Sequence, residues 1–193
     1  MVEALRAKHT KNKKNMYRQQ RLTLILALVV LFMGGCKKWL KDEERTLNRQ
    51  PYNSNELKID GYYYYLENRK IWKTYFFYRN GTLHYGIASD TLDNDLVKYD
   101  AWFASDYYSN IIKTDHNRWG LFQIHDDSIV LERWSIQEGG DPVLRVSGHI
   151  LNDTTFVMTR SEYPYSGEVY QHDLTYHFHQ FSPKPDSTNV FIP

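Results

Sequence analysis

The hydrophobic and polar positions divide the chain into parts with different periodicity. Residues 22–33 (LTLILALVVLFM) form an unbroken apolar run. Residues 37–56 are rich in charges, Asn and Ser without a sustained period, which is typical of a flexible linker. From there on, short aromatic and aliphatic runs alternate with turn residues. This division predicts a leader, a tether at 36–56, one folded domain at 57–182 and an irregular tail at 183–193.

Eight runs within the folded domain have the length and composition of β-strands, because each is rich in aromatic and β-branched residues and bounded by turn residues. They are 57–67, 70–79, 82–89, 118–125, 128–136, 143–151, 154–163 and 168–181. Asn80-Gly81 separates the second run from the third and predicts a hairpin with a type I′ turn, whose two central residues need positive φ. Short connections between successive strands predict an antiparallel meander.

One segment between the third and fourth strands has a helical period. Its apolar residues recur every three or four positions, namely Leu92, Leu96, Tyr99, Phe103, Tyr107 and Ile111. We therefore expect one helix near 92–112. The candidate N-caps are Asp90, Thr91 and Asp93.

A meander of this length can close into a barrel, which removes both sheet edges. The fold class is therefore mostly β, an eight-stranded antiparallel barrel, with an open sheet or β-sandwich as the alternative. The succession YFFYRNGTL, a helix, WGLFQIHDDSIVLERW and GHILNDTTFVM resembles the lipocalin-like domains of small, uncharacterised bacterial lipoproteins over 57–182. The resemblance implies a barrel interior that is filled by side chains or holds one small ligand, and it implies no particular chemistry.

The N-terminal residues have the three regions of a secretory signal peptide. Residues 1–21 carry a net charge of +6, from seven Lys and Arg against one Glu. The apolar run at 22–33 is shorter than the roughly 20 residues that span a bilayer, and Gly34-Gly35 follows it. We expect 1–35 to be a signal peptide. Met16 is an alternative start, which would make 1–15 an upstream extension.

The lone cysteine, Cys36, comes directly after this leader. Met33-Gly34-Gly35-Cys36 resembles the lipobox of bacterial lipoproteins, with Met33 where that family usually has Leu. The resemblance implies a diacylglyceryl thioether on Cys36, usually with a third acyl chain on its amine, and hence a stable lipid anchor. Because lysines and not Asp follow Cys36, it also implies the outer membrane. An ordinary signal peptide beside a chance cysteine is the alternative.

Charge and histidine placement restrict the chemistry of the domain. The net charge of the whole chain is +1, but that of residues 36–193 is −5. A negative domain argues against a nucleic-acid partner. His177 and His179 share one face of the last strand and could bind a metal ion with His125 or His149, whereas the simpler interpretation places them on a solvent face with Tyr176 and Phe178 inward. The acids after His125 suit a turn better than a catalytic triad. We expect no cofactor.

The aromatic residues, 16% of the chain, suggest a binding surface because strands carry them on both faces. The candidates are Tyr62, Tyr64, Trp72, Tyr75, Trp102, Trp119 and Trp134. The competing interpretation is that the helix covers one face and the rest is core packing. The leading functional hypothesis is a lipid-anchored envelope module that binds an apolar small molecule, a glycan or a partner protein. The alternatives are an envelope hydrolase or metal-dependent enzyme that uses the strand histidines, and a structural subunit of a complex.

Overall fold

The computed structural model describes residues 46–67, 70–87, 92, 95–135 and 142–192, with the backbone alone at 67, 70–72 and 87. The predicted signal peptide, Cys36 and the three candidate N-caps lie outside the described residues. Among the helices that are described, none is long and apolar enough to cross a bilayer.

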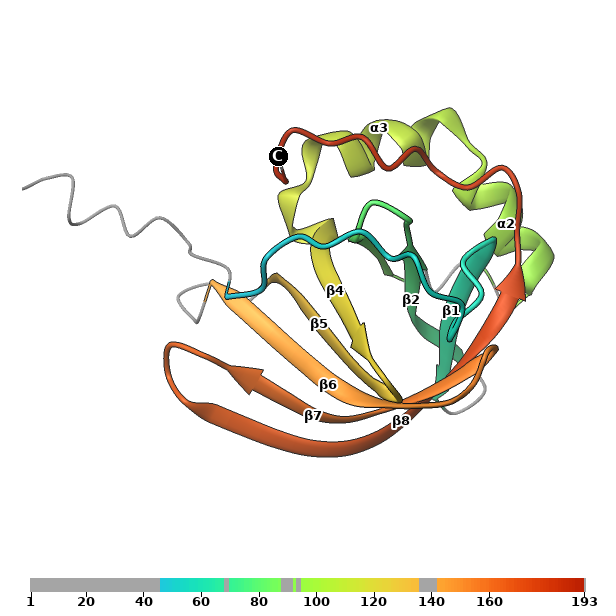
Figure 1. Ribbon diagram of the computed structural model, residues 1–193. Helices are drawn as coiled ribbons and strands as arrows, with labels where there is room; N and C mark the ends of the chain where they lie inside the picture. The colour runs from blue at the N-terminus through green and yellow to red at the C-terminus, as the bar shows by residue number, and fades with distance from the viewer. Residues whose placement is uncertain (1–45, 68–69, 88–91, 93–94, 136–141, 193) are drawn as a thin grey trace, which may run out of the picture. The chain divides into compact units, whose positions relative to one another are not determined.

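The described strands form one closed antiparallel barrel in which each strand pairs with its neighbour in sequence and the last pairs with the first (Figure 1). The eight strands are β1 Gly61–Glu67, β2 Lys70–Phe77, β3 Thr82–Ile87, β4 Trp119–His125, β5 Ser128–Trp134, β6 Val143–Asn152, β7 Thr155–Tyr163 and β8 Glu168–Gln180. This confirms the predicted meander and excludes the open sheet and the sandwich. Tyr63 pairs with Phe178 at the closing seam.

Strand alternation separates two hydrophobic clusters. The first, which we call the barrel core, lies in the interior and receives side chains from every strand. Its buried members are Tyr52, Leu57, Tyr63, Tyr75, Phe77, Leu83, Tyr85, Phe122, Ile129, Leu131, Val146, Phe156, Met158 and Tyr176. Aromatic ring pairs stabilise this core by more than the burial of their apolar area alone. In one such pair the stacked rings of Phe156 and Tyr176 have their centres 4.9 Å apart.

The segment expected to form one helix is divided into α2 Leu96–Phe103 and α3 Asp106–Thr114, followed by the 3-10 turn η3 His116–Arg118. Asp95 caps α2 by accepting a hydrogen bond from the Val97 amide. Ser105 then accepts one from the Tyr108 amide and begins a second helix. The apolar period continued across this break, so periodicity alone did not reveal it.

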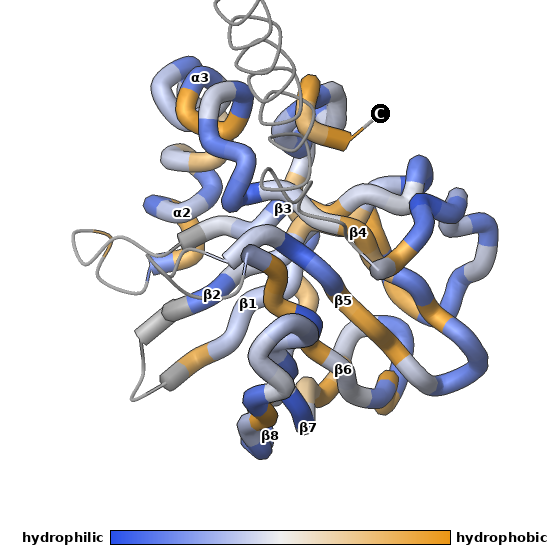
Figure 2. The backbone as a smooth tube through the Cα atoms, turned by 90° about the vertical axis from the view of Figure 1, so that its left-hand side faces the viewer, coloured by the Kyte–Doolittle hydropathy of each residue, from blue (hydrophilic) through white to orange (hydrophobic). Residues whose placement is uncertain are grey.

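The helices pack on the outer face of β1 to β4. We call this second group the outer cluster; its buried members are Tyr62, Phe76, Tyr78, Tyr99, Phe103, Tyr108, Ile112, Trp119, Leu121, Trp134, Phe181 and Ile192. The hydrophobic and hydrophilic residues of α3 lie on different sides of the helix (Figure 2). The Trp119 indole donates a hydrogen bond to the Ile112 carbonyl at 2.7 Å, which joins α3 to the barrel.

The predicted hairpin between β2 and β3 is confirmed, but the predicted type I′ turn is wrong. Among the described non-glycine residues only Asp126 has positive φ, so Asn80 does not meet the requirement. Instead the Gly81 amide bonds to the Tyr78 carbonyl, Tyr78 pairs with Thr82, and Gly81 takes φ of 83°. This is a type I turn followed by a glycine bulge. Asn80 is the second central residue of this turn, and its side chain accepts from the Thr82 amide.

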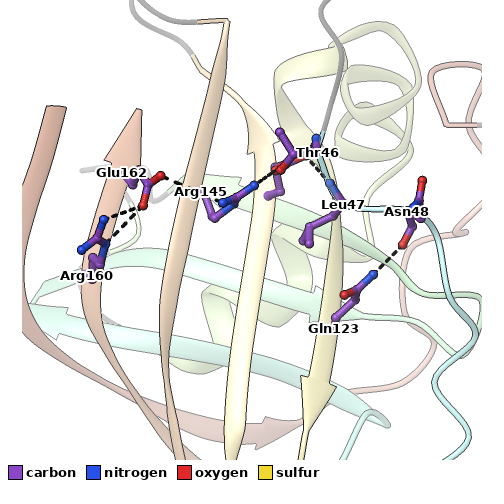
Figure 3. A network of polar contacts seen from close by, with 8 residues as sticks. Thr46, Leu47, Asn48, Gln123, Arg145, Arg160 and Glu162 are labelled. Atoms are coloured by element: carbon purple, nitrogen blue, oxygen red, sulfur yellow. Dashed lines mark hydrogen bonds and ion pairs between the residues drawn. The ribbon is translucent and has the colours of Figure 1, made fainter. Parts of the chain in front are cut away.

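Residues 46–60 form a segment that we call the N-terminal strap. The sequence pattern placed 36–56 in a flexible tether, yet the described part of that range packs on the barrel. Thr46 and Leu47 bond to Glu132 on the outside of β5, and Gln123 of β4 donates to the Asn48 carbonyl (Figure 3). Apart from a bond from the Thr46 hydroxyl to Glu132, these contacts use backbone groups of the strap, so side-chain composition gave little sign of them.

The strap then crosses one end of the barrel. Tyr52 donates its amide to the Arg79 carbonyl, and the Lys58 amide donates to the Asp153 carbonyl on the opposite side. Tyr52 and Leu57 are buried in the barrel core. Residues 181–192 contain no helix or strand. Lys184 donates to the Ile59 and Phe77 carbonyls at the same end of the barrel, whereas Phe181 and Ile192 pack in the outer cluster.

Candidate functional site

The predicted aromatic surface is divided between the two packed clusters. Tyr62, Trp119 and Trp134 are buried in the outer cluster, and Tyr75 is buried in the barrel core. Tyr64 and Trp102 are half-buried beside the outer cluster. The Trp72 side chain lies outside the described residues. The six described residues therefore contribute to packing and do not come together as one exposed face.

The candidate metal ligands also lie apart. His177 and His179 are on the outer face of β8, and Tyr176 and Phe178 point into the barrel core, as predicted. His179 Nε2 lies 3.0 Å from an oxygen of Asp100, whose other oxygen accepts from the Tyr62 hydroxyl. His177, His125 and His149 are exposed. In the part of the chain that the structure describes, no three His, Cys, Asp or Glu side chains are grouped to hold a metal.

A charged residue that the sequence analysis did not single out lies inside the barrel. Arg133 follows Ile129 and Leu131 on the inward face of β5 and is only 8% exposed. Its guanidinium carbon lies 4.1 Å above the centre of the Tyr85 ring. Nη1 donates to the Trp134 carbonyl, whereas Nε has no hydrogen-bond partner. An arginine in this position is a buried cation with unused donor capacity.

Two tyrosines beside Arg133 are neutral. Burial raises the pKa of Tyr75 to about 12, although the positive charge of Arg133 and its hydrogen bond to the phenol act in the opposite direction. Burial likewise raises the pKa of Tyr176 well above its ordinary value. Neither phenol is therefore a phenolate near pH 7, so neither neutralises Arg133.

Two more basic side chains lie toward the same end of the barrel interior. Lys73 is on the inward face of β2 with Tyr75. His172 of β8 lies with its Nε2 3.3 Å from Ser161 Oγ, and burial, followed by the charge of Lys73, lowers the pKa of His172. Lys73, His172 and Ser161 are partly exposed, so solvent reaches them. We call this region, defined by Lys73, Arg133 and His172, the basic end.

The strap occupies the other end. Tyr52 packs on Phe122 there, with ring centres 5.5 Å apart. A pocket of about 220 Å³ remains between the strap and β4, lined by residues that include Gln50, Tyr52 and Gln123. Ligand sites usually measure about 300–1,000 Å³. The pocket under the strap is smaller than that range and is lined by no charged side chain, whereas the basic end contains the buried Arg133.

The presence of a charged side chain inside the barrel could have been detected from the sequence. Strand SIVLERW places Glu132 and Arg133 side by side, and neighbouring residues of a strand face opposite sides. One of the two charges therefore has to point into the barrel. Which one does so depends on the register of β5 with β4 and β6, and that was not available from the pattern.

Comparison of the chain with protein families, with curated proteins and with solved structures found no match in any of the three. No function can therefore be transferred from a relative.

Proposed function

We propose that this chain is a lipid-anchored binding module of the bacterial cell envelope that holds a small ligand at the basic end of its barrel. The observation that supports this most directly is the buried position of Arg133. Transfer of a charge into an apolar interior costs several kcal/mol unless it is paired. A barrel interior that served only stability would be filled better by Leu or Met at this position.

The barrel architecture suits the proposal. The strap seals one end with Tyr52 and Leu57. An eight-stranded barrel is wide enough for one small ligand. Leu144, Leu174 and Tyr65 face the interior next to the barrel core and are only partly buried, so they offer apolar contact area. These features support the lipocalin-like interpretation of the sequence.

The envelope location rests on the sequence of the leader and on Cys36. If Cys36 carries the anchor, nine residues separate it from Thr46, the first residue seen on the barrel. A fully extended chain reaches roughly 3.5 Å per residue. The barrel would then lie within about 35 Å of the bilayer surface, a shorter reach than a tether ending at residue 56 would allow.

Acylation of Cys36 makes a direct prediction. We expect a palmitate analogue to label the wild-type protein in growing cells and to leave the Cys36→Ser variant unlabelled, because only a thiol can form the thioether. The variant should also be absent from the envelope fraction that detergent solubilises. Asn48→Ser, a change of similar size on the strap, serves as the control and should be labelled like the wild type. Equal labelling of the Cys36 variant would exclude this anchor.

Ligand binding at the basic end predicts that filling the interior blocks a neutral probe. Leu144 pairs with Arg133 across the strands, and Leu144→Trp places extra volume beside it. We expect this variant to bind 2-naphthylmethanol at least tenfold more weakly than the wild type, a loss of ~1.4 kcal/mol, in ligand-observed NMR. Leu151→Trp adds the same volume at an exposed position of β6 and should bind normally. If Leu144→Trp binds the probe as tightly as the wild type, or if the wild type binds neither this alcohol nor naphthalene-2-carboxylate, the proposed function is wrong.

A further inference from the structure

The structure assigns a chemical class to this ligand: we infer that it carries a carboxylate, or an equivalent monoanionic group, which Arg133 binds inside the barrel beside an apolar body. This inference rests on the proposed function and specifies its ligand. Three observations lead to it, namely the unpaired charge, the geometry of the donors and the aromatic walls around them.

The charge of Arg133 has no anionic partner among the described residues. Glu132 is adjacent in sequence but lies on the outer face, where it accepts from Thr46, Leu47 and Arg145. The charged neighbours that act on Tyr75 and His172 are Arg133 and Lys73, both positive. A buried cation of this kind is stabilised when an anion binds next to it. The missing partner is therefore expected to come from the ligand.

The donor geometry favours a carboxylate. A guanidinium presents its N–H groups in a planar fork that matches the two oxygens of a carboxylate. Nη1 of Arg133 is used by the Trp134 carbonyl, and Nε is available without breaking a bond. The Tyr85 ring covers one face of the Arg133 guanidinium. An acceptor can then approach in the plane of the guanidinium, along its N–H groups. One arginine suits a monoanion, whereas a phosphate dianion usually requires several donors and charges.

The surrounding side chains favour an apolar and flat body. Tyr85, Tyr176 and Tyr75 stand around Arg133, and Leu144 and Leu174 extend the wall toward the partly exposed part of the interior. Aromatic rings bind flat apolar groups through large contact areas at little entropic cost. The Tyr176 hydroxyl donates to Tyr75, and the neutral Tyr75 hydroxyl has its own proton to donate to the same carboxylate.

The test compares two probes with the same ring system, one carrying an anionic carboxylate and the other a neutral alcohol. Naphthalene-2-carboxylate and 2-naphthylmethanol are titrated calorimetrically into the full chain in detergent, with detergent alone as the blank. We expect the wild type to bind the carboxylate about thirtyfold more tightly than the alcohol, which corresponds to ~2 kcal/mol. Arg133→Met keeps the length of the side chain without its charge and should bind both probes equally. Arg133→Lys keeps the charge without the planar fork and should retain part of the preference.

Arg160→Met is the matched control, because Arg160 lies on the outer face of β7 in an ion pair with Glu162. It should keep the full preference. Circular dichroism and thermal unfolding verify that each variant is folded. A wild type that binds both probes equally, or an Arg133→Met variant that still prefers the carboxylate, would overturn the inference and leave the binding function in place. Absence of binding by both probes would overturn both.

Discussion

Replacement of Glu132 with alanine should release the N-terminal strap and destabilise the folded domain by about 3 kcal/mol. The Glu132 carboxylate is fully buried. It accepts from the Thr46 amide at 2.6 Å, the Thr46 hydroxyl at 2.5 Å and the Leu47 amide at 3.0 Å (Figure 3). Arg145 Nη2 completes the set at 3.3 Å. Hydrogen bonds to a charged group each contribute about 1.5–3 kcal/mol, and truncation also leaves the donors without a partner.

Urea unfolding followed by tryptophan fluorescence measures this loss, and hydrogen exchange at Thr46 and Leu47 reports the strap. Glu162→Ala is the matched control, because Glu162 belongs to the same network through Arg145 and Arg160 but is partly exposed. Exposed ion pairs contribute at most about 1 kcal/mol. If the two variants lose equal stability, or if the strap amides of Glu132→Ala stay protected, the role assigned to Glu132 is wrong.

Acidification from pH 7 to pH 4.5 should destabilise the domain by about 3 kcal/mol more in the wild type than in a His84→Gln variant. His84 is fully buried between barrel and helices, facing Phe76 of β2, Tyr108 of α3 and Trp119 of β4. Burial, with a smaller contribution from the charge of Arg118, lowers the pKa of His84 to about 3. The folded protein therefore keeps His84 neutral over this whole pH range.

The loss of stability on acidification follows from proton uptake by the unfolded chain. An unfolded histidine has a pKa of about 6.5, so below that pH the unfolded chain binds a proton at His84 that the folded chain does not bind. Stability then falls with pH by about 1.4 kcal/mol per unit between 6.5 and the folded pKa. Above pH 6.5 both states are neutral and the contribution disappears. Glutamine cannot gain this proton, so the difference between the two pH profiles isolates His84 from all carboxylates.

Urea unfolding at several pH values between 4.5 and 7.5 tests the prediction. His149→Gln is a suitable control, because His149 is exposed on β6 and its replacement should leave the slope unchanged. Parallel profiles for wild type and His84→Gln would show that the folded protein protonates His84 after all.

Much of the barrel was predictable because its pattern is local. Each strand is recognisable as a run of aromatic and β-branched residues between turn residues. Successive strands pair in the order of the sequence. Alternation placed Tyr176 and Phe178 on one face of β8 and His177 and His179 on the other, and the apolar character of the first pair indicated that it points inward. The leader and Cys36 are outside the described residues, and lipidation stays a prediction for the labelling experiment.

The errors concern features that depend on neighbours. Asn80-Gly81 marked the hairpin but not its turn type, because the register between β2 and β3 selected a bulged type I turn. Ser105 divided the expected helix, since a cap can begin a new helix inside a continuous apolar period. Aromatic residues suggested a surface, although Tyr62 and Trp119 are buried once α2 and α3 cover the barrel.

The amino-acid sequence by itself determined the number and order of the strands, the two-sided character of each strand and the position of the lone cysteine, since these depend on residue type and short spacing. Only the tertiary structure decided that Glu132 faces out to hold a strap 86 residues earlier in the chain, and that Arg133 faces in. The physical reason is that the sheet closes into a barrel. A strand's period defines two faces, but the register and the pairing of β8 with β1 determine which face becomes the interior.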